Sequence, residues 1–579
     1  MVCSESGEIV MSYGYTDEVN TLILISLLKQ HYIRKIIVSP GTTNISFVGS
    51  VQFDPWFEVY SAVDERSAAY MACGLAEESG EPVVLSCTGA TASRNYLPGL
   101  TEAYYRHLPV LAVTSTQHIG RVGNYVAQVI DRSQLFPDLV KKSIQLPTVH
   151  SNEDEQYSVT AVNDALLELT HGVMGPVHIN LATTYSNNFI IRNLPEFRKI
   201  SRVSDGDFPA LPKGKIAVFI GAHGAFSEEE TEIIDAFCEA HDAIVLCDHV
   251  SNFRGKYRYL ASLVNSQNYD YGLSNYDLII YIGYVHGTYL PFSGRTLWRV
   301  NPDGIVRDPY KNLTYVFEME EIEFFRHYQS GQAQVTLLPR SIHARQAVES
   351  KLRELPFSNV WIAKETAGRI PKNSVLHLSI LNTLRVWNYF ETPASVLCYS
   401  NTGGYGIDGC LSSCIGSAIA NEQTEHFIVI GDLSFFYDLN SILSGIPANM
   451  HILLINNGLG TEFKNYNHRA SYFGDDADRY MAAKGHNGFK NAVVVDTLCK
   501  HMGIRYLFAT NKDEYLSCLD AWMLPGPVLL EVFTNDREES DALRIVNTAV
   551  QDTSFRAKLM RSPIGRVANI VRRWLIRWT

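Results

Sequence analysis

Hydrophobic and polar positions along the chain alternate between short apolar runs and longer amphipathic stretches. Four apolar, β-branched runs in the first third of the chain occupy residues 33–41, 82–89, 108–115 and 175–182. Runs of this length predict buried strands, and stretches between them, such as "SRNYLPGLTEAYYRH", are compatible with helices. Strands that alternate with helices predict βαβ units and a parallel sheet.

The same pattern recurs twice further along the chain. A proline-containing linker around residues 203–213 precedes "KIAVFIGAHGAF", which opens a second α/β unit. The third unit contains the apolar runs "SVLHLSI", "HFIVIGD", "HILLINN" and "GPVLLEV". We therefore predict the α/β class with three doubly wound parallel-sheet domains, at residues 10–195, 205–330 and 338–540.

The composition is that of a globular protein, and it limits the classes of partner that we expect. Of 579 residues, 46% are hydrophobic and 19% are charged, and the formal net charge of −12 makes nucleic acid an unexpected partner. The ten cysteines are scattered without a zinc-type pair, and the N-terminus lacks the basic start and apolar core of a signal peptide. No run approaches the roughly 18–20 apolar residues of a membrane span. These features predict a cytoplasmic protein with reduced cysteines.

The C-terminal segment, residues 553–579, differs from the rest of the chain. From Phe555 onward it has seven basic residues and no acidic ones, and apolar residues that include Trp574 and Trp578 recur at helical spacing. This pattern predicts a basic amphipathic helix. Three placements stay open: docking on the acidic body of the protein itself, peripheral association with a membrane, and contact with a partner.

Polar residues directly follow two apolar runs of the third unit. Gly431-Asp432 follows the run "HFIVI", and Asn456-Asn457-Gly458 follows the run "HILLI". Ligands bind beyond the carboxyl ends of parallel strands, so the oxygens of Asp432 and Asn457 converge if these strands are neighbours. A carboxylate, an amide oxygen and a backbone carbonyl suit a Mg²⁺ ion that keeps its other positions for phosphate and water. Alternatively, Asp432 caps a helix and Asn-Asn-Gly forms a turn.

Two further stretches carry candidate chemistry. In "SAVDERSAAYMACGLAEESG", Glu65 precedes small residues that allow close helix packing, which would place the carboxylate at a packed interface. The alternative is a solvated helix start, where the helix dipole favours Asp64 and Glu65. In "YSNTGGYGIDGCLSSCIGSAIA", four glycines lead into a helix, and Ile407 is the apolar residue among them. An ordinary glycine-rich loop would look the same.

Taken together, these motifs resemble those of the thiamine-diphosphate-dependent 2-oxo-acid decarboxylases and acetolactate synthases. That family binds its cofactor through Gly-Asp and Asn-Asn motifs, which match Gly431-Asp432 and Asn456-Asn457, and the resemblance extends from about residue 16 to residue 535. The stretches "SPGTTN", "DERSAAYMACGLA", "YSNTGGYGIDG" and "GDLSFFYDLN" most resemble the menaquinone branch of the family. The resemblance implies pyrimidine-binding, middle and diphosphate-binding domains, with thiamine diphosphate and Mg²⁺ as cofactors.

The resemblance also implies roles for individual residues. Asp432 and Asn457 would bind Mg²⁺ through their side chains, and Leu459 through its carbonyl. Glu65 would hydrogen-bond the aminopyrimidine ring of the cofactor, and Gln128 would line the reaction centre. The residues at cofactor-binding positions are Gly41, Thr88, Asn95, Thr402, Gly403, Ile407, Gly431, Leu433 and Ser434. Ile407 would be the bulky residue that holds the cofactor bent, a conformation that brings its reacting groups together.

Several substrate positions depart from the menaquinone branch. Thr43, Gln117 and Thr402 stand where that branch has arginines for the carboxylates of its substrates, whereas Arg385 stands where an arginine is expected. A nearby position where serine is expected holds Leu381. Each lost charged hydrogen bond removes about 1.5–3 kcal/mol of binding. We therefore expect Thr43, Gln117 and Arg385 to contact a smaller, less anionic donor such as pyruvate, or a hydroxyl-rich, sugar-like acceptor.

Three functional hypotheses follow. The first is a carboligase that decarboxylates a 2-oxo acid and transfers the acyl carbanion, stored on the cofactor, to a carbonyl acceptor. The second is a simple 2-oxo-acid decarboxylase, and the third is a non-catalytic scaffold of the same fold. The glycines of "GAHGAF" give no support for FAD in the middle unit. The resemblance implies a homodimer or homotetramer with active sites at the subunit interface.

Overall fold

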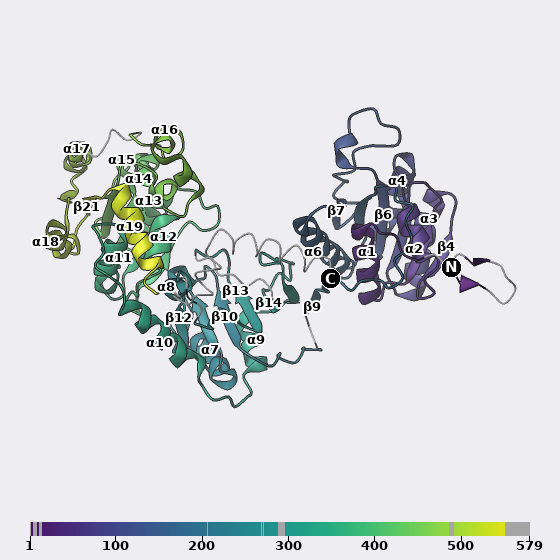
Figure 1. Cartoon of the computed structure of the whole chain (residues 1–579), viewed down its shortest axis with the longest axis horizontal. Helices are drawn as coiled ribbons and strands as arrows, with labels where there is room; N and C mark the ends of the chain where they lie inside the picture. The colour runs from purple at the N-terminus through teal and green to yellow at the C-terminus, as the bar shows by residue number, and fades with distance from the viewer. Residues whose placement is uncertain are drawn as a thin grey trace. The chain divides into compact units, whose positions relative to one another are not determined.

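The structure, a computed structural model, describes residues 2, 3, 9, 10 and 14–550, except for 205, 268, 270, 288–295 and 486–490. The chain divides into two compact units (Figure 1). Unit 1 comprises Met1–Pro209 and Thr296–Glu318, and unit 2 comprises Ala210–Arg295 and Met319–Thr579. The predicted tail helix, residues 553–579, lies outside the described residues.

Unit 1 contains a six-stranded parallel sheet with the strand order β4-β3-β5-β6-β8-β7. Its strands are β3 (Lys35–Val38), β4 (Glu58–Ser61), β5 (Val83–Cys87), β6 (Val110–Thr116), β7 (Lys142–Leu146) and β8 (Val177–Ala182). Successive side chains point to opposite faces: Ile36 and Val38 belong to one hydrophobic core, and Ile37 belongs to another. Both faces are buried, which explains why the central strands are largely apolar.

Helices cover both faces of this sheet. They are α1 (Val19–Gln30), α2 (Ile45–Val51), α3 (Glu65–Ser79), α4 (Thr91–Asn95), α5 (Leu97–Tyr105), α6 (Asn152–Glu168) and the 3-10 helix η1 (Ile119–Arg121). Residues of α1, α2 and α6 pack in one core, and residues of α3 and α5 pack in the other. The small residues of α3 allow close packing, because a Cβ added at Gly99 of α5 would lie 2.4 Å from the Cβ of Ala69.

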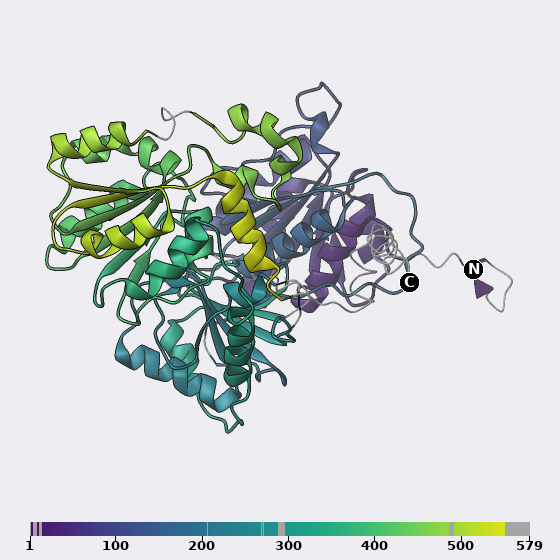
Figure 2. The same ribbon diagram turned by 60° about the vertical axis from the view of Figure 1, so that its left-hand side comes forward.

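Unit 2 contains a second six-stranded parallel sheet, with the order β17-β16-β18-β19-β21-β20 and helices on both faces (Figure 2). Its strands are β16 (Val375–Leu378), β17 (Leu397–Tyr399), β18 (His426–Gly431), β19 (Met450–Asn456), β20 (Arg505–Ala509) and β21 (Val528–Phe533). Its helices are α10 (Leu337–Glu349), α11 (Asn359–Thr366), η3 (Ala367–Arg369), α12 (Asn382–Trp387), α13 (Cys410–Ala420), α14 (Asp432–Tyr437), α15 (Leu439–Leu443), η4 (Thr461–Lys464), η5 (Arg469–Asp476), α16 (Ala477–Tyr480), α17 (Ala492–Met502), α18 (Lys512–Trp522) and α19 (Asp536–Asn547).

The remaining long strands form a third sheet, with the order β12-β11-β10-β13-β14-β15-β9. They are β9 (Ser201–Val203), β10 (Ile216–Ile220), β11 (Ile244–Cys247), β12 (Arg258–Leu260), β13 (Leu278–Ile282), β14 (Thr296–Val300) and β15 (Leu313–Phe317). The accompanying helices are α7 (Glu228–His241), η2 (His249–Ser251), α8 (Ser262–Asn265) and α9 (Glu321–Tyr328). Two short N-terminal strands, β1 (Val2–Cys3) and β2 (Ile9–Val10), pair with each other.

Both six-stranded sheets have a point at which the strand order reverses. β4 and β5 lie on opposite sides of β3, and β17 and β18 lie on opposite sides of β16. In open α/β sheets, ligands bind at such points, beyond the carboxyl ends of the strands. The predicted class, α/β with three parallel sheets, is confirmed, whereas the predicted domain boundaries stay predictions.

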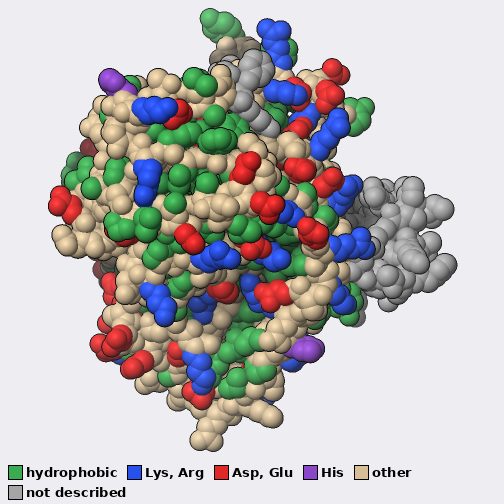
Figure 3. Space-filling model, turned by 90° about the vertical axis from the view of Figure 1, so that its left-hand side faces the viewer, with side chains coloured by type: hydrophobic (Ala, Val, Ile, Leu, Met, Phe, Trp, Pro, Cys, Tyr) green, Lys and Arg blue, Asp and Glu red, His purple; other side chains and the backbone are tan. Residues whose placement is uncertain are grey.

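Surface charge and helix composition bear on two further expectations. On the face in Figure 3, Lys and Arg side chains lie among Asp and Glu side chains rather than in a patch of one sign. The expectation that nucleic acid is not a partner stays a prediction. Within the described residues, none of the helices has both the length and the apolar composition that a membrane crossing requires.

Candidate functional site

Asp432 and Asn457 lie side by side at the carboxyl end of the sheet of unit 2. Their strands, β18 and β19, are neighbours, with Gly431 opposite Ile455 in the ladder. The Oδ2 atom of Asp432 accepts a hydrogen bond from the backbone N–H of Gly458 at 2.8 Å. Both side chains are largely buried, with 3% of Asp432 and 7% of Asn457 exposed. The structure therefore brings together the two residues that the sequence pairs.

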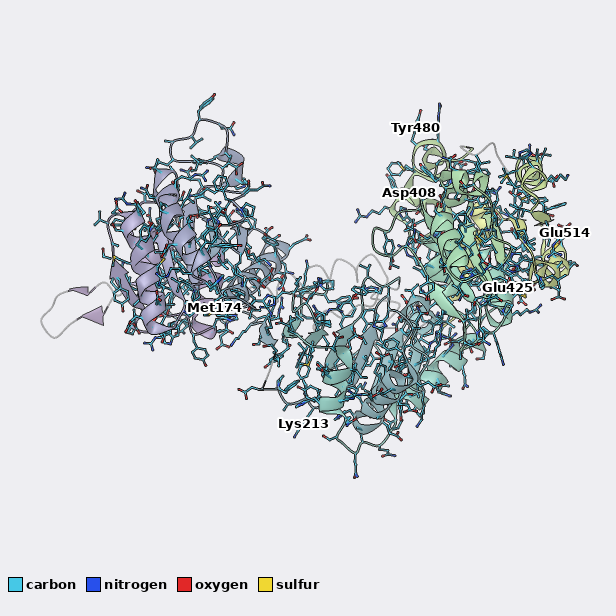
Figure 4. The ribbon with its side chains drawn as sticks, turned by 180° about the vertical axis from the view of Figure 1, so that it is seen from behind. Met174, Lys213, Asp408, Glu425, Tyr480 and Glu514 are labelled. Carbon is cyan, nitrogen blue, oxygen red and sulfur yellow. The ribbon has the colours of Figure 1, made fainter. Side chains whose placement is uncertain are left out.

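These residues line a cavity of about 210 Å³. Seven residues predicted to bind the cofactor or the metal line it: Ile407, Gly431, Asp432, Leu433, Ser434, Asn457 and Leu459. The hydroxyl of Ser434 donates to the carbonyl oxygen of Ile407 at 2.6 Å, so it holds the loop that carries this residue. That loop lies between β17 and α13, next to Asp408, which is labelled in Figure 4. Thr402 and Gly403, on the same loop, are not among the residues that line this cavity.

The oxygen ligands of this cavity suit a divalent ion that also binds phosphate better than a metal ion bound by protein side chains alone. Among the described residues, no three His, Cys, Asp or Glu side chains come together as metal ligands. Asp432 provides one carboxylate, and Asn457 adds an amide oxygen. Mg²⁺ is commonly held by one or two carboxylates and completes its shell with substrate phosphates and water. A Cβ added at Gly431 would meet no atom within 4 Å, which leaves room for a ligand close to the backbone.

The two adjacent asparagines have different surroundings. The side chain of Asn456, the last residue of β19, donates to Oε1 of Glu531 at 2.7 Å, and the hydroxyl of Tyr506 donates to Oε2 of Glu531 at 2.7 Å. Burial raises the pKa of the Glu531 carboxyl, although both hydrogen bonds oppose that shift. Asn456 therefore fixes the strand end within the sheet, and Asn457 alone faces the cavity.

In unit 1, Gly41, Thr43 and Thr88 meet where the strand order reverses. A Cβ at Gly41 would lie 2.5 Å from the Cβ of Thr88, so this turn requires a glycine. The hydroxyls of Thr43 and Thr88 lie 2.5 Å apart, and the Thr43 hydroxyl also donates to the carbonyl oxygen of Ser115 at 3.3 Å. Thr43 is buried, with 3% exposed. The prediction that Thr43 binds substrate therefore requires one of these bonds to open.

Glu65 is the first residue of α3, directly after the N-cap residue Asp64, whose side chain accepts from the backbone N–H of Ser67 at 2.7 Å. The side-chain amide of Asn95, at the end of α4, donates to Oε2 of Glu65 at 3.4 Å. The sequence does not reveal this pairing, because thirty residues separate the two. A carboxylate and an amide thus share one edge of unit 1.

Gln128 and Gln117 lie further along the same edge. Gln128 has a φ of 62°. Its carbonyl oxygen would lie 2.8 Å from a Cβ added at Gly89, the residue that follows Thr88. Gln117 follows β6 and lines a cavity of about 90 Å³ together with His118 and Arg132. Arg132, which the sequence does not single out, is buried, with 3% exposed.

Arg385 lines another cavity of unit 2, of about 450 Å³. Most of the other side chains that line it are hydroxyl or amide groups: Ser262, Asn265, Ser266, Tyr389 and Tyr405. Arg385 forms an ion pair of 2.7 Å with Glu462, which lines the cavity of Asp432. The loop that carries Ile407 also carries Tyr405, so the two cavities share a loop and an ion pair.

Comparisons with known proteins bear on this arrangement. Residues 21–135 match the family model "Thiamine pyrophosphate enzyme, N-terminal TPP binding domain". Proteins named 2-succinyl-5-enolpyruvyl-6-hydroxy-3-cyclohexene-1-carboxylate synthase are similar over most of the chain. The one from Phocaeicola vulgatus is 30% identical over 568 residues, which are 92% of this chain and 98% of that protein. The one from Bacteroides thetaiotaomicron is 29% identical with the same shares, and the one from Desulfotalea psychrophila is 26% identical over 87% of this chain and 96% of its own.

The segment matched by the family model includes Gly41, Glu65, Thr88 and Asn95. The relatives extend the similarity to the third sheet and to the Asp432 cavity. The chain belongs to the thiamine pyrophosphate enzyme family that includes the 2-succinyl-5-enolpyruvyl-6-hydroxy-3-cyclohexene-1-carboxylate synthases, and it is a thiamine-diphosphate-dependent decarboxylase or carboligase.

Proposed function

We propose that the enzyme decarboxylates a small, pyruvate-like 2-oxo acid and transfers the acyl fragment to a hydroxyl-rich, sugar-like carbonyl acceptor. The observation that carries the cofactor chemistry is the pairing of Asp432 and Asn457 in one cavity with Gly431, Leu433 and Ser434. Thiamine diphosphate, when bound, supplies a carbanion that adds to the 2-oxo acid and accepts the electrons left by CO2. The residues of this chain would bind the cofactor, orient it and hold a proton at its ring.

We assign the diphosphate end to unit 2. Asp432 and Asn457, with the carbonyl of Leu459, would hold Mg²⁺ against the diphosphate oxygens. Asp432 begins α14, and backbone amides at a helix start favour anions. Ile407 is held by Ser434 at the wall of the same cavity, which suits a side chain that fixes the bend of the cofactor.

We assign the ring end to unit 1. Glu65 carries a carboxylate that would hold a proton at the pyrimidine ring, and Asn95 orients it through the hydrogen bond of 3.4 Å. Gly41 and Thr88 form the adjacent turn. Gln128 and Gln117 lie along the same edge and would face the substrates. Glu65→Gln keeps the hydrogen-bonding shape of the side chain and removes its charge, so it should abolish CO2 release while leaving the Tm unchanged.

The second cavity of unit 2 supports the proposed acceptor class. Hydroxyl and amide groups from Ser262, Asn265 and Tyr405 suit an acceptor with several hydroxyls, and Arg385 offers one cation. The Arg385–Glu462 pair neutralises part of that cation, which disfavours a multiply charged acceptor. Thr402, on the loop shared by both cavities, would lie close to the acceptor.

Mass spectrometry of the products tests this proposal. The enzyme is incubated with Mg²⁺, thiamine diphosphate and pyruvate, 2-oxobutanoate or 2-oxoglutarate, with or without aldehyde, ketone and keto-sugar acceptors. A C–C-bonded product that appears with an acceptor supports the carboligase. Release of the free aldehyde alone supports the simple decarboxylase, and no CO2 release from any donor supports the scaffold.

We further propose that the enzyme is a homodimer or homotetramer in which Glu65 and Asp432 of one site come from different subunits. Glu65→Gln and Asp432→Asn should each be inactive. Subunits of the two variants mixed in equal amounts should regain about a quarter of the wild-type activity, because half of the dimers are mixed and each mixed dimer has one intact site. Mixed subunits that stay inactive would overturn the shared site, and differently tagged Glu65→Gln subunits mixed with each other provide the control.

A further inference from the structure

The turn that begins at Gly458 and ends at Gly460, which we call the ligand turn, is held at both ends by a segment further along the chain. The backbone N–H of Gly460 donates to the carbonyl oxygen of Ala482 at 2.6 Å. The backbone N–H of Gly485 donates to the carbonyl oxygen of Gly458 at 3.2 Å. We call the segment that begins at Ala482 and ends at Gly485 the bracing segment, because these two hydrogen bonds join it to the ligand turn.

The ligand turn lines the cavity of Asp432. Leu459 and Gly460 are among the residues that line this cavity, and Leu459 is predicted to bind Mg²⁺ through its carbonyl oxygen. A backbone carbonyl has no side-chain rotamers, so it reaches a metal ion only where the backbone of the turn places it. Affinity for the metal ion and its diphosphate therefore depends on what holds the turn in place.

The conformation of the bracing segment needs support from its neighbours. Ala483 has a φ of 52°, in the left-handed region that alanine rarely adopts. Such conformations persist where the surrounding structure fixes them. Ala482 is fully buried, whereas the side chain of Lys484 is half exposed. The contacts of Lys484 therefore help to decide whether the segment keeps this bend.

The carboxylate of Asp478, in α16, connects the bracing segment to the helix that follows the ligand turn. Its Oδ1 atom accepts from Nζ of Lys464 at 2.6 Å, and its Oδ2 atom accepts from Nζ of Lys484 at 2.6 Å. Lys464 is the last residue of η4, which begins directly after Gly460. The backbone N–H of Lys484 also donates to the carbonyl oxygen of Asp478 at 2.8 Å. One carboxylate thus bridges the two parts of the chain that the backbone hydrogen bonds join.

This bridge is ionised and partly shielded from water. Only 17% of the Asp478 side chain and 10% of the Lys464 side chain are exposed. Burial by itself would raise the pKa of the Asp478 carboxyl, but the hydrogen bonds from Lys464 and Lys484 lower it below its ordinary value. Because salt screens partly buried ion pairs less than exposed ones, the bridge should persist at physiological ionic strength.

We propose that Asp478 is a positioning residue for the cofactor: by pairing with Lys464 and Lys484, it holds the ligand turn in the conformation that binds Mg²⁺ and thiamine diphosphate. This inference rests on the proposed function and deepens it, because it names a residue outside the cavity on which cofactor affinity depends. Asp478 is not among the described residues that line the Asp432 cavity, so it acts through the turn. Without the bridge the turn opens more often, and the fraction of molecules that are ready to bind the cofactor decreases.

The first test measures the hold on the turn without the cofactor. Hydrogen exchange of the full chain, free of cofactor, is followed by mass spectrometry in the peptides that contain Gly460 and Gly485. When opening and closing are fast, an amide exchanges in proportion to the fraction of time for which its hydrogen bond is open. Asp478→Asn should therefore speed exchange in both peptides about 2- to 30-fold, the factor expected for the loss of two partly exposed ion pairs.

Two variants and one internal comparison make this result specific. Asp496→Asn is the matched control, because Asp496 pairs with Lys500 at 2.6 Å on α17, and it should leave both peptides unchanged. Asp478→Glu keeps the charge and should restore part of the wild-type protection. Equal exchange in the wild type and Asp478→Asn would overturn the proposal. Faster exchange that extends to the peptides of β18 and β21 would overturn it as well, since Asp478 would then support the fold at large.

The second test measures the effect on the cofactor. Isothermal titration gives the Kd of thiamine diphosphate in excess MgCl2. Asp478→Asn should raise this Kd about 3- to 30-fold, and Lys484→Gln should raise it by a smaller factor. The double variant should match Asp478→Asn alone, because the pairing with Lys484 is already lost there. Additive effects of the two substitutions would show that the residues act separately, which would refute the bridge.

The outcomes separate this inference from the proposed function. If the wild type does not bind thiamine diphosphate, the proposed function fails, and hydrogen exchange still decides whether Asp478 holds the turn. If the wild type binds the cofactor and Asp478→Asn binds it equally well, the proposed function stands and the positioning role of Asp478 is refuted.

Discussion

Gly431 offers a substitution that separates cofactor binding from folding. Its φ of −78° and ψ of 158° are open to any L residue, and an added Cβ would meet no atom within 4 Å. Gly431 lines the cavity that also contains Asp432 and Asn457, so the added methyl group would occupy space that we assign to the diphosphate. Gly431→Ala should therefore fold as the wild type does and bind thiamine diphosphate poorly.

The magnitudes follow from the surroundings of this residue. The free energy of unfolding should stay constant or rise by about 0.4–1 kcal/mol, because alanine restricts the unfolded chain more than glycine does. A methyl group forced against a bound ligand costs about 1–3 kcal/mol, as in an overpacked core. At about 1.4 kcal/mol per tenfold, this cost raises the Kd for thiamine diphosphate about 5- to 140-fold.

Two measurements check both halves of this prediction. Thermal unfolding without cofactor reports stability, and isothermal titration with thiamine diphosphate in excess MgCl2 reports affinity. Gly416→Ala is the matched control, since Gly416 is exposed on α13 and has no atom within 4 Å of an added Cβ. A wild-type Kd in Gly431→Ala would refute the placement of the diphosphate. A lower Tm in the absence of cofactor would refute the claim that the fold does not need this glycine.

Two further predictions concern stability. Thr43→Val should lower the free energy of unfolding by about 0.5–1.5 kcal/mol, because it removes the hydrogen bond from the Thr43 hydroxyl to the carbonyl of Ser115, which still accepts from Arg132. Thr101→Val, on the exposed face of α5, should cost less in the same denaturant titration. Burial lowers the pKa of His178 to about 3, so below about pH 6.5 the unfolded state takes up a proton that the folded state does not. Stability should therefore fall as the pH drops from about 6.5 towards 3, by up to about 1.4 kcal/mol per pH unit, and His178→Gln should flatten that dependence in denaturant titrations at several pH values.

The part of the site that the sequence predicts well depends on strand ends. Asp432 and Asn457 each follow a run of apolar residues, and parallel strands place their carboxyl ends at one edge of a sheet. Given that rule, adjacency of β18 and β19 is the one additional requirement, and the ladder meets it. Spacing in the sequence is informative here because the backbone of the sheet fixes where each side chain begins.

The orientation of side chains between elements is harder to predict. Thr43 is polar and follows a strand, as Asp432 does, yet its hydroxyl turns to Thr88 and the carbonyl of Ser115 inside the unit. Arg132 has a loop position like that of many surface arginines, yet it is buried. In both cases the outcome depends on neighbours distant in sequence, and neither composition nor periodicity contains that information.

Electrostatics explains why such local features decide what this enzyme binds. The chain has a net charge of −12, so its long-range field does not attract a diphosphate or a carboxylate. Asp432 adds a further negative charge at the diphosphate site, which makes a divalent ion the natural partner there. A substrate carboxylate likewise needs a cation at short range, and the ion pair with Glu462 reduces what Arg385 can offer. Affinity for anions in this protein should therefore depend on local charges and a bound divalent ion rather than on the net charge of the chain.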